Sequence, residues 1–383
     1  MSQINAIFKE MGVGEWEGWN PVSQARFTES NVMAAMDLID NKAGLRPHRH
    51  EYALKEAITT TAFPTLFGVI IDRELNARYK DVPQTWSAYT KVGTVSNFNQ
   101  HTRDRMNGGT DPLPRVDEKG EYLVMPQSTT QYTRQVYKRG RQFDISWEAL
   151  VNDGMGAFDD IPQVMGRSAA NTEAWEVAGL IASATGPNAL TFGAPIVDVD
   201  GVNVTNLGTL PLTLANFQTV CALMSAQTDR HGMPMRIRPK HLVVDVALED
   251  TAWAILTSMQ VQYTESAGGG AVPWGVNNPI PRKGIQLHVN DWLSYIDTSG
   301  NVGTTWYVFG DTGQGYAIGF DRLKGHEGPE ICMKASNKAQ VGGGLISAFD
   351  GDFETDNVLY RVRVCQGGNR LDPRFAYAQT GTG

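Results

Sequence analysis

The chain has 383 residues, which at about 150 residues per domain is enough for roughly two to three domains and at least one sizeable hydrophobic core. Charged residues make up 19% of the sequence, and 41 acidic against 33 basic side chains leave a net charge of -8. This balance excludes a domain that neutralises nucleic-acid phosphates over a broad basic face.

The three cysteines and the N-terminal residues indicate the cellular compartment of the chain. Cys221, Cys332 and Cys365 are odd in number, far apart and in no CxxC spacing, so neither a disulfide framework nor a zinc site is expected. A reducing compartment fits best. The first residues show no basic region followed by an apolar segment, and no continuous apolar run of about 18 residues occurs, so we expect neither a secretory signal nor a membrane span.

The first half of the chain predicts an arm, a helical stretch and a hairpin. Residues 1–50 mix short amphipathic pieces with turn-formers, which indicates an extended arm, and residues 51–89 follow a helical repeat. Between residues 90 and 140 short alternating runs such as 95–98 and 122–125, separated by Gly- and Asp-rich turns, predict a long antiparallel hairpin. It carries many charges and few core candidates, so it is expected to project with open edges.

A long helix is predicted over about 159–184, with Asp159 as its N-cap and Pro162 in its first turn. Small or apolar residues at 3–4 spacing predict its packed face. They are Ile161, Met165, Ser168, Thr172, Trp175, Gly179 and Ala182. Such a helix would be a spine within residues 141–211.

The second half of the chain predicts a mixed α/β domain. Thr213 caps a helix that continues to Thr228, residues 241–245 are a buried strand, and residues 248–259 form another helix. Strands are expected at 306–309 and 316–320, and residues 358–364 alternate strictly as a returning strand.

Candidate chemical sites are weak. The glycine-rich run 310–315 is followed by a strand pattern, so a hairpin turn is favoured over a phosphate loop. Asp198 and Asp200 begin like a calcium loop that lacks its later ligand, and His48 with His50 lack a third ligand. No catalytic motif occurs, so we expect no catalytic, cofactor-binding or metal residues and no enzymatic activity.

The segment 263–282, which contains Trp274, concentrates Gly, Pro and Asn in a long loop. Two interpretations stay open for it: an active-site lid, or a loop that meets symmetry-related copies around an axis.

The order arm, hairpin, long helix, α/β domain and returning strand resembles the major capsid proteins of tailed bacteriophages with the Hong Kong 97-type fold. It is most similar to the Mu-type and prophage head-subunit subgroup. The motifs that carry the resemblance are Val92–Asn99, Leu113–Tyr122, Tyr137–Asp153, Ala157–Phe158 with Pro162, and Asn369–Arg374.

The resemblance implies an α+β fold with an N-terminal arm (1–50), a helical part of the arm or P-domain (51–89), an E-loop hairpin (90–140), a P-domain with the spine helix (141–211), an A-domain (212–335) and a return to the P-domain (336–383). It implies hexamers and pentamers that close into an icosahedral head around double-stranded DNA, without tight DNA binding by the wall. Portal, scaffolding and decoration proteins are the other expected partners. The implied location is the virion, after assembly in the host bacterial cytoplasm.

Subunit contacts are expected where the hairpin and the axial loop meet neighbours. The candidates are Arg103, Arg105, Lys138, Arg139, Arg141, Asp159, Asp160 and Trp274. We hypothesise that the basic residues meet the acidic helix start at Asp159 and Asp160 of another copy.

Other classes stay open as alternatives. An encapsulin-like compartment shell shares the fold, a cytosolic two-domain enzyme would use 263–282 as its mobile loop, and a phage tail or portal component is a further possibility.

Overall fold

The computed structural model describes residues 75–107, 112–122, 124, 128–146, 156–198, 201–229, 232–258, 260–264, 273–338 and 351–382. The predicted arm and most of the helical stretch after it lie outside these residues. The chain divides into two compact units. The first comprises Met1–Pro83, Lys138–Thr172 and His326–Cys365, and the second Gln84–Tyr137, Glu173–Gly325 and Gln366–Gly383. Among the helices of the described part, none combines the length and apolar character that a bilayer crossing requires.

The first unit contains a small sheet. In it β16 (Glu330–Met333) pairs antiparallel with the first part of β17 (Val358–Arg370), and β4 (Tyr137–Ile145) also pairs with β17. Alternate residues of β17 are buried, as the sequence pattern predicts, because one face of the strand forms the core. Tyr360 on this face stacks on Phe143 with ring centroids 5.1 Å apart.

The larger sheet of the second unit has the order β13-β10-β14-β18-β9. Its strands are β13 (Gln286–Val289), β10 (Pro239–Val244), β14 (Trp306–Gly310), β18 (Ala376–Gln379) and β9 (Leu207–Gly208). The central strand β14 is buried along its whole length. The C-terminal strand β18 therefore lies beside β14, within the sheet built by the predicted α/β segment.

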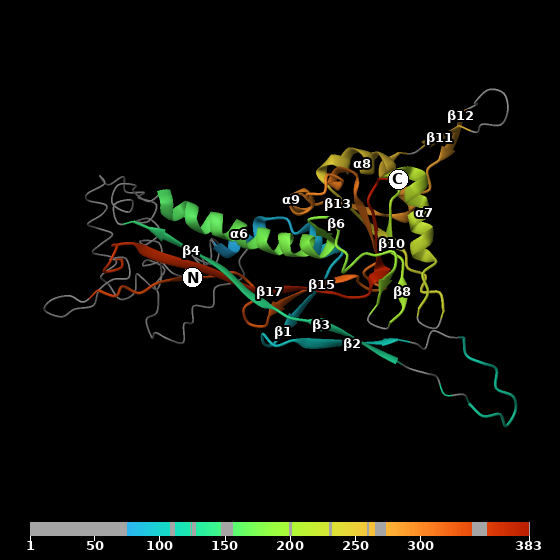
Figure 1. Ribbon diagram of the computed structural model, residues 1–383, viewed down its shortest axis with the longest axis horizontal. Helices are drawn as coiled ribbons and strands as arrows, with labels where there is room; N and C mark the ends of the chain where they lie inside the picture. The colour runs from blue at the N-terminus through green and yellow to red at the C-terminus, as the bar shows by residue number, and fades with distance from the viewer. Residues whose placement is uncertain are drawn as a thin grey trace, which may run out of the picture. The chain divides into compact units, whose positions relative to one another are not determined.

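Three helices accompany this sheet: α7 (Leu214–Ser225), α8 (Glu249–Thr257) and α9 (Trp292–Ile296) (Figure 1). Thr213 caps α7, as predicted, because its hydroxyl accepts a hydrogen bond from the Asn216 amide at 3.3 Å. The helix ends at Ser225, three residues before the predicted end. Local capping chemistry was thus readable in the sequence.

A second group of strands in this unit carries the hairpin. β1 (Lys91–Val95) runs parallel to β15 (Ile318–Leu323), which pairs antiparallel with residues 366–370 of β17. β2 (His101–Asn107) and β3 (Ser128–Arg134) form the predicted antiparallel hairpin, with His101 opposite Arg134. The strands predicted at 95–98 and 122–125 are wrong, because β1 ends at Val95 and residues 96–98 form a bend, and because residues 122 and 124 are not in a strand.

The remaining elements are short. Two-stranded sheets join β5 (Ala182–Ser183) to β6 (Gly186–Pro187) and β7 (Ile196–Val197) to β8 (Asn203–Val204). A third joins β11 (Gln260–Thr264) to β12 (Pro273–Asn277). The irregular loop predicted at 263–282 is therefore partly wrong, since two paired strands occupy both sides of it.

The glycine-rich run 310–315 connects two different sheets, so the predicted hairpin turn is wrong. β14 pairs with β10 and β18, whereas β15 pairs with β1 and β17. The close approach of Phe375 explains a glycine here, because a Cβ on Gly315 would lie 2.5 Å from its ring.

The long helix α6 (Gly156–Ile181) begins three residues before the predicted start, so Asp159 lies inside the helix and is not its N-cap. The predicted packed face is wrong at Ser168 and Trp175, which are exposed, and right at Ala182, which is buried, while the side chain of Ile161 lies outside the described residues. Trp175 is 37% exposed, whereas Glu173 and Val177 are buried. The reason is an ion pair: the Glu173 carboxylate binds the Arg322 guanidinium at 2.8 Å, which permits burial of a charge on the core side.

Two histidines lie inside the larger sheet. His241 of β10 and His288 of β13 place Nδ1 and Nε2 3.0 Å apart, beside the buried ring of Tyr89. Burial, and then the neighbouring His241, lowers the pKa of His288 to about 4. Burial also lowers the pKa of His241, while Asp311 raises it and Lys240 lowers it. Both rings therefore fold in the neutral form.

We predict that acid destabilises the isolated subunit through this pair. Because the folded pKa of His288 lies below the unfolded value of 6.5, the unfolded chain binds more protons, and the free energy of unfolding falls as the pH drops from about 6.5 towards 4. Urea unfolding measured across this range should give a shallower slope for His288→Gln than for the wild type. Equal slopes in His288→Gln and wild type would contradict the assignment.

Candidate assembly surface on the β2–β3 hairpin

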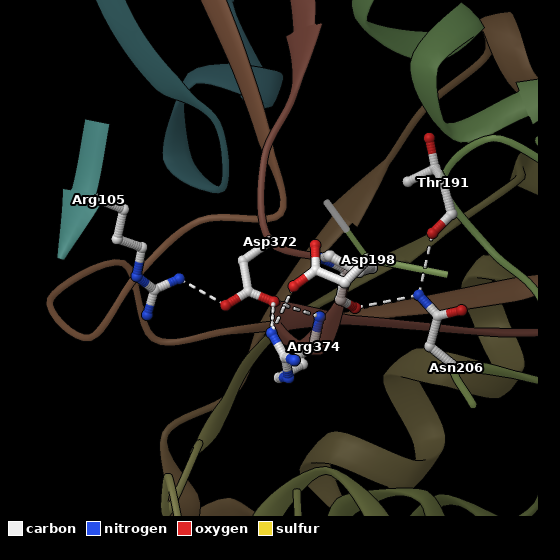
Figure 2. A network of polar contacts seen from close by, with 7 residues as sticks. Arg105, Thr191, Asp198, Asn206, Asp372 and Arg374 are labelled. Atoms are coloured by element: carbon white, nitrogen blue, oxygen red, sulfur yellow. Dashed lines mark hydrogen bonds and ion pairs between the residues drawn. The ribbon is translucent and has the colours of Figure 1, made fainter. Parts of the chain in front are cut away.

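The base of the hairpin is fixed to the body of the second unit through Arg105 on β2. Its guanidinium forms an ion pair with the Asp372 carboxylate and lies over the Phe375 ring, 5.3 Å from the ring centroid. The side chain of Asp372 is only 3% exposed, so the contact is made on the buried side of the hairpin. Figure 2 shows Arg105 reaching Asp372 from one side while Arg374 binds it from the other.

Arg374 joins two buried carboxylates. Its Nη1 donates to Asp198 Oδ2 at 2.7 Å and to Asp372 Oδ1 at 3.2 Å, and all three side chains are at least 95% buried. Burial lowers the pKa of Arg374, whereas the neighbouring carboxylates of Asp372 and Asp198 raise it by more. The pKa of Arg374 therefore lies above its ordinary value. The arginine stays charged because it is paired.

Asn206 extends this network to the neighbouring backbone. Its Nδ2 donates to the carbonyl oxygens of Thr191 and Pro373, each at 3.0 Å (Figure 2). The Gly193 amide donates to Asn206 Oδ1 at 2.8 Å. The segment 191–206 is thereby tied to the turn that begins at Asp372.

A third buried carboxylate, Asp321 of β15, holds the other edge of the hairpin base. Arg134 of β3 approaches Asp321 Oδ1 at 3.5 Å, and Asn369 Nδ2 donates to Asp321 Oδ2 at 2.7 Å. Burial lowers the pKa of Arg103, Asp321 raises it and Arg134 lowers it again. Arginines from both strands of the hairpin thus converge on one carboxylate that is 0% exposed.

Gly367 of β17 allows the chain after β3 to come close. A Cβ at this position would lie 2.0 Å from the carbonyl oxygen of Gln135, a distance that real Cβ atoms do not reach. Only a glycine lets β17 and the β3–β4 connection approach so closely.

The distal part of the hairpin has the opposite character. Beyond the paired strands, Leu113, Tyr122 and Val124 are 86%, 82% and 93% exposed. Exposed carboxylates at Asp117, Glu118 and Glu121 lie among them. Large apolar side chains gathered on one segment and left in water mark an interaction surface.

The structure brings together some of the predicted contact residues and not others. Arg103 and Arg105 lie at the hairpin base and are engaged within their own chain. Lys138 and Arg141 are exposed on β4, and Arg139 is partly buried there. The side chains of Asp159 and Asp160 in α6 and of Trp274 in β12 lie outside the described residues. Their contacts with another copy stay predictions.

Sequence reasoning missed the buried partners of these arginines. Asp321 and Asp372 lie far from Arg134 and Arg105 in the chain, and although Asp372 belongs to the motif Asn369–Arg374, that motif does not indicate its distant partner. Asp198, considered above for calcium, binds Arg374 instead. Within the described ranges, no group of three or more potential ligand residues is arranged to hold a metal ion.

Comparison with known proteins gives the class of the chain. A family model described as a phage capsid protein matches residues 130–379. No curated protein matches the sequence. The predicted α+β capsid fold, proposed above from the Hong Kong 97-type resemblance, is confirmed by the observed elements and this match, whereas the Mu-type subgroup stays a prediction.

Solved structures similar to the chain include shell proteins. The asymmetric unit of the bacteriophage PhiM1 mature capsid matches with a TM-score of 0.45 and 9% identity, over 77% of this chain and 86% of that one. The capsid of Cyanophage P-SCSP1u matches at 0.43 and 14%, over 76% and 85%. An encapsulin from Synechococcus elongatus matches at 0.39 and 10%, over 78% and 88%. The assignment rests on the family match, because these scores are low.

We predict that Arg374 contributes more than Arg105 to the free energy of unfolding. Arg374→Met leaves the buried Asp198 carboxylate unpaired and Asp372 with Arg105 alone, and should cost about 3–5 kcal/mol, whereas Arg105→Met keeps Arg374 on Asp372 and should cost about 1 kcal/mol. Chemical denaturation of the unassembled subunit measures both. Equal losses of unfolding free energy in the two variants would mean that burial of Asp372 and Asp198 does not require the charge of Arg374.

Gly367→Ala is expected to destabilise the hairpin base by about 1–3 kcal/mol, because the new methyl group must displace the Gln135 carbonyl. Gly179→Ala in α6 is the matched control. A Cβ there meets nothing within 4 Å, so the change should stabilise the helix by about 0.5–1 kcal/mol. Thermal unfolding of the two variants should therefore shift in opposite directions; a shift in the same direction would contradict the close approach.

Proposed function

The chain belongs to the phage capsid protein family, and from that membership we propose how it builds its shell. It is a structural protein of the virion capsid and assembles with copies of itself. We propose that the copies form hexamers and pentamers, which close into an icosahedral head around double-stranded DNA. Assembly takes place in the host bacterial cytoplasm, with portal, scaffolding and decoration proteins as further partners, and the chain has no enzymatic activity.

The observation that carries this proposal is the contrast within the hairpin. Its base is held by buried ion pairs at Asp372 and Asp321, while its tip exposes Leu113, Tyr122 and Val124 almost fully. A monomer gains nothing from ordering an apolar tip in water. A subunit that inserts the tip into its neighbours gains burial of this apolar surface at every contact in the shell.

The charge of the chain supports a container that does not bind its contents tightly. A net charge of -8 on each subunit repels phosphate on average, which supports a wall that does not bind DNA over a broad face. Packaged DNA can then enter and leave without breaking many contacts with the wall.

Electron microscopy and size-exclusion chromatography of the expressed protein test the proposal. Closed particles with five-fold and six-fold capsomers are expected. A stable 42.0 kDa monomer at high concentration, with or without scaffolding partners, would contradict it.

The exposed tip residues are expected to control assembly and not folding. Replacing Leu113, Tyr122 and Val124 together by serine should change the free energy of unfolding by less than about 0.5 kcal/mol, because these side chains are 82–93% exposed in the isolated chain. Particle yield should fall sharply, as measured by sedimentation. Arg115→Ser, which changes a 92% exposed charge in the same segment, is the control and should assemble normally. Normal assembly of the triple variant would show that these tip residues take no part in assembly.

A further inference from the structure

A groove of about 440 Å³ lies beside the base of the hairpin, wholly within the second unit. One wall is β3 with the residue that follows it, and the opposite wall combines the segment 190–198 with the end of β17. Both walls carry polar side chains. They include Gln100, Gln131, Thr133, Arg134, Gln135, Thr191, Asn369 and Arg370. The groove therefore suits a small ligand that makes several hydrogen bonds.

Arg370 brings a cation to the groove without a carboxylate partner. Its Nε donates to the neutral hydroxyl of Thr191 at 3.2 Å, and among the described residues no carboxylate forms an ion pair with it. Burial lowers the pKa of the guanidinium. A guanidinium that loses water without gaining an anion keeps N–H donors for an external acceptor.

Arg134 brings a second cation to the opposite wall, and its carboxylate partner is shared. The Arg134 side chain is 23% exposed, and its Nη1 lies 3.5 Å from Asp321 Oδ1. Two further cations, Arg103 and Lys91, lie in the field of the same carboxylate. Burial lowers the pKa of both, whereas the charge of Asp321 raises it. Since three cations share one carboxylate, positive charge remains in excess on this side of the groove.

The acidic residue in the lining does not cancel this excess. Of the described residues that line the groove, Asp198 is the only acid, and its Oδ2 accepts from Arg374 Nη1 at 2.7 Å (Figure 2). Both side chains of this pair are at least 95% buried. The groove therefore has a positive potential, although the whole chain has a net charge of -8. A local positive potential in an acidic protein selects anions.

We propose that this groove binds a small phosphate-bearing anion, inorganic phosphate or a phosphate monoester, between Arg134 and Arg370. A guanidinium presents parallel N–H donors whose spacing matches two phosphate oxygens. Thr133 and Gln131, exposed on the hairpin wall, supply a hydroxyl and an amide for the remaining oxygens. Because the two arginines lie on opposite walls, the bound anion ties the hairpin base to the end of β17.

The size of the groove and the charge of the chain favour a small anion over a nucleic acid. A volume of about 440 Å³ lies within the range of pockets for small molecules. A polyanion would also meet the surface outside the groove, where the net charge of -8 repels it. A single phosphate group needs only the groove itself.

Equilibrium dialysis of the dissociated full-length subunit against radiolabelled inorganic phosphate measures binding. At constant ionic strength, Arg370→Gln and Arg134→Gln should each weaken binding about tenfold or more, since one charge-assisted contact is worth about a factor of ten. Arg115→Gln, which removes a 92% exposed arginine elsewhere on the hairpin, is the matched control and should bind as the wild type does. No phosphate binding by the wild type, or equal binding by Arg370→Gln, would overturn the site.

A second pair of variants keeps every arginine in place. Thr133→Glu puts a carboxylate on the exposed hairpin wall of the groove and should weaken phosphate binding about tenfold or more, because it neutralises the local positive charge. Thr219→Glu makes the same change at an exposed position on α7 and should bind normally. Urea unfolding in phosphate-free buffer confirms that the variants are folded. Equal losses in both variants would mean that net charge, and not the groove, determines binding.

Hydrogen exchange tests whether one anion contacts both walls. Inorganic phosphate should slow amide exchange in residues 131–135 and 190–198 of the wild type together, relative to chloride at the same ionic strength, and should have no such effect in Arg370→Gln. Slower exchange on one wall alone would overturn the bridging arrangement. Slower exchange with a single-stranded oligonucleotide but not with inorganic phosphate would assign the groove to nucleic acid and overturn the proposal.

These measurements are independent of the proposed function, because they use the dissociated subunit. Absence of phosphate binding would overturn the site and leave the proposed shell intact. Absence of particles from a wild-type chain that binds phosphate would instead overturn the proposed function and leave the site intact.

Discussion

Three buried carboxylates beneath the hairpin determine how the second unit is built. Asp198, Asp321 and Asp372 are almost fully buried, and a buried carboxylate is stable only when paired with a cation and hydrogen-bond donors. Arg374 pairs within the body, whereas Arg105 and Arg134 come from the two strands of the hairpin. The hairpin base is therefore fixed by groups that the core itself requires. Its direction follows from charge pairing and not from apolar packing alone.

The base of the hairpin is fixed within its own chain, whereas its tip exposes apolar side chains to solvent. At the base, ion pairs and the close approach of Gly367 to the Gln135 carbonyl fix the position of the backbone. At the tip, large apolar side chains have no partner within the described part of their own chain, and in the groove Arg370 has no carboxylate there. A rigid support for an unsatisfied surface is what repeated association of identical subunits needs, because orientation is fixed before contact and little ordering entropy is lost on binding. Many such modest contacts can close a shell without one strong interface.

Sequence patterns predicted the elements whose formation depends on residues only a few positions apart in the chain. The Thr213 cap, the buried strand around His241 and the existence of a long helix were all predictable, because their causes are local. The packed face of α6 was not, since burial of Glu173 depends on Arg322, 149 residues away. The strand predicted at 122–125 failed because a short apolar run does not show by itself whether its residues lie in a sheet or on an exposed segment. The connection after β14 was taken for a hairpin because a pattern of strands does not say to which sheet each strand belongs.

By itself, the sequence determined that the chain is a large α+β protein without a phosphate loop, a nucleophile motif or a basic face, and its motifs pointed to a capsid subunit. Composition and nearest neighbours suffice for those conclusions. Only the tertiary structure decided which charges are paired: Arg105 meets Asp372 across 267 residues, and Arg134 meets Asp321 across 187. It likewise placed Arg370 beside Thr191 in a groove of the second unit, where none of the described carboxylates pairs with it. Long-range pairing depends on the folded path of the whole backbone, and no local pattern of residues encodes that path.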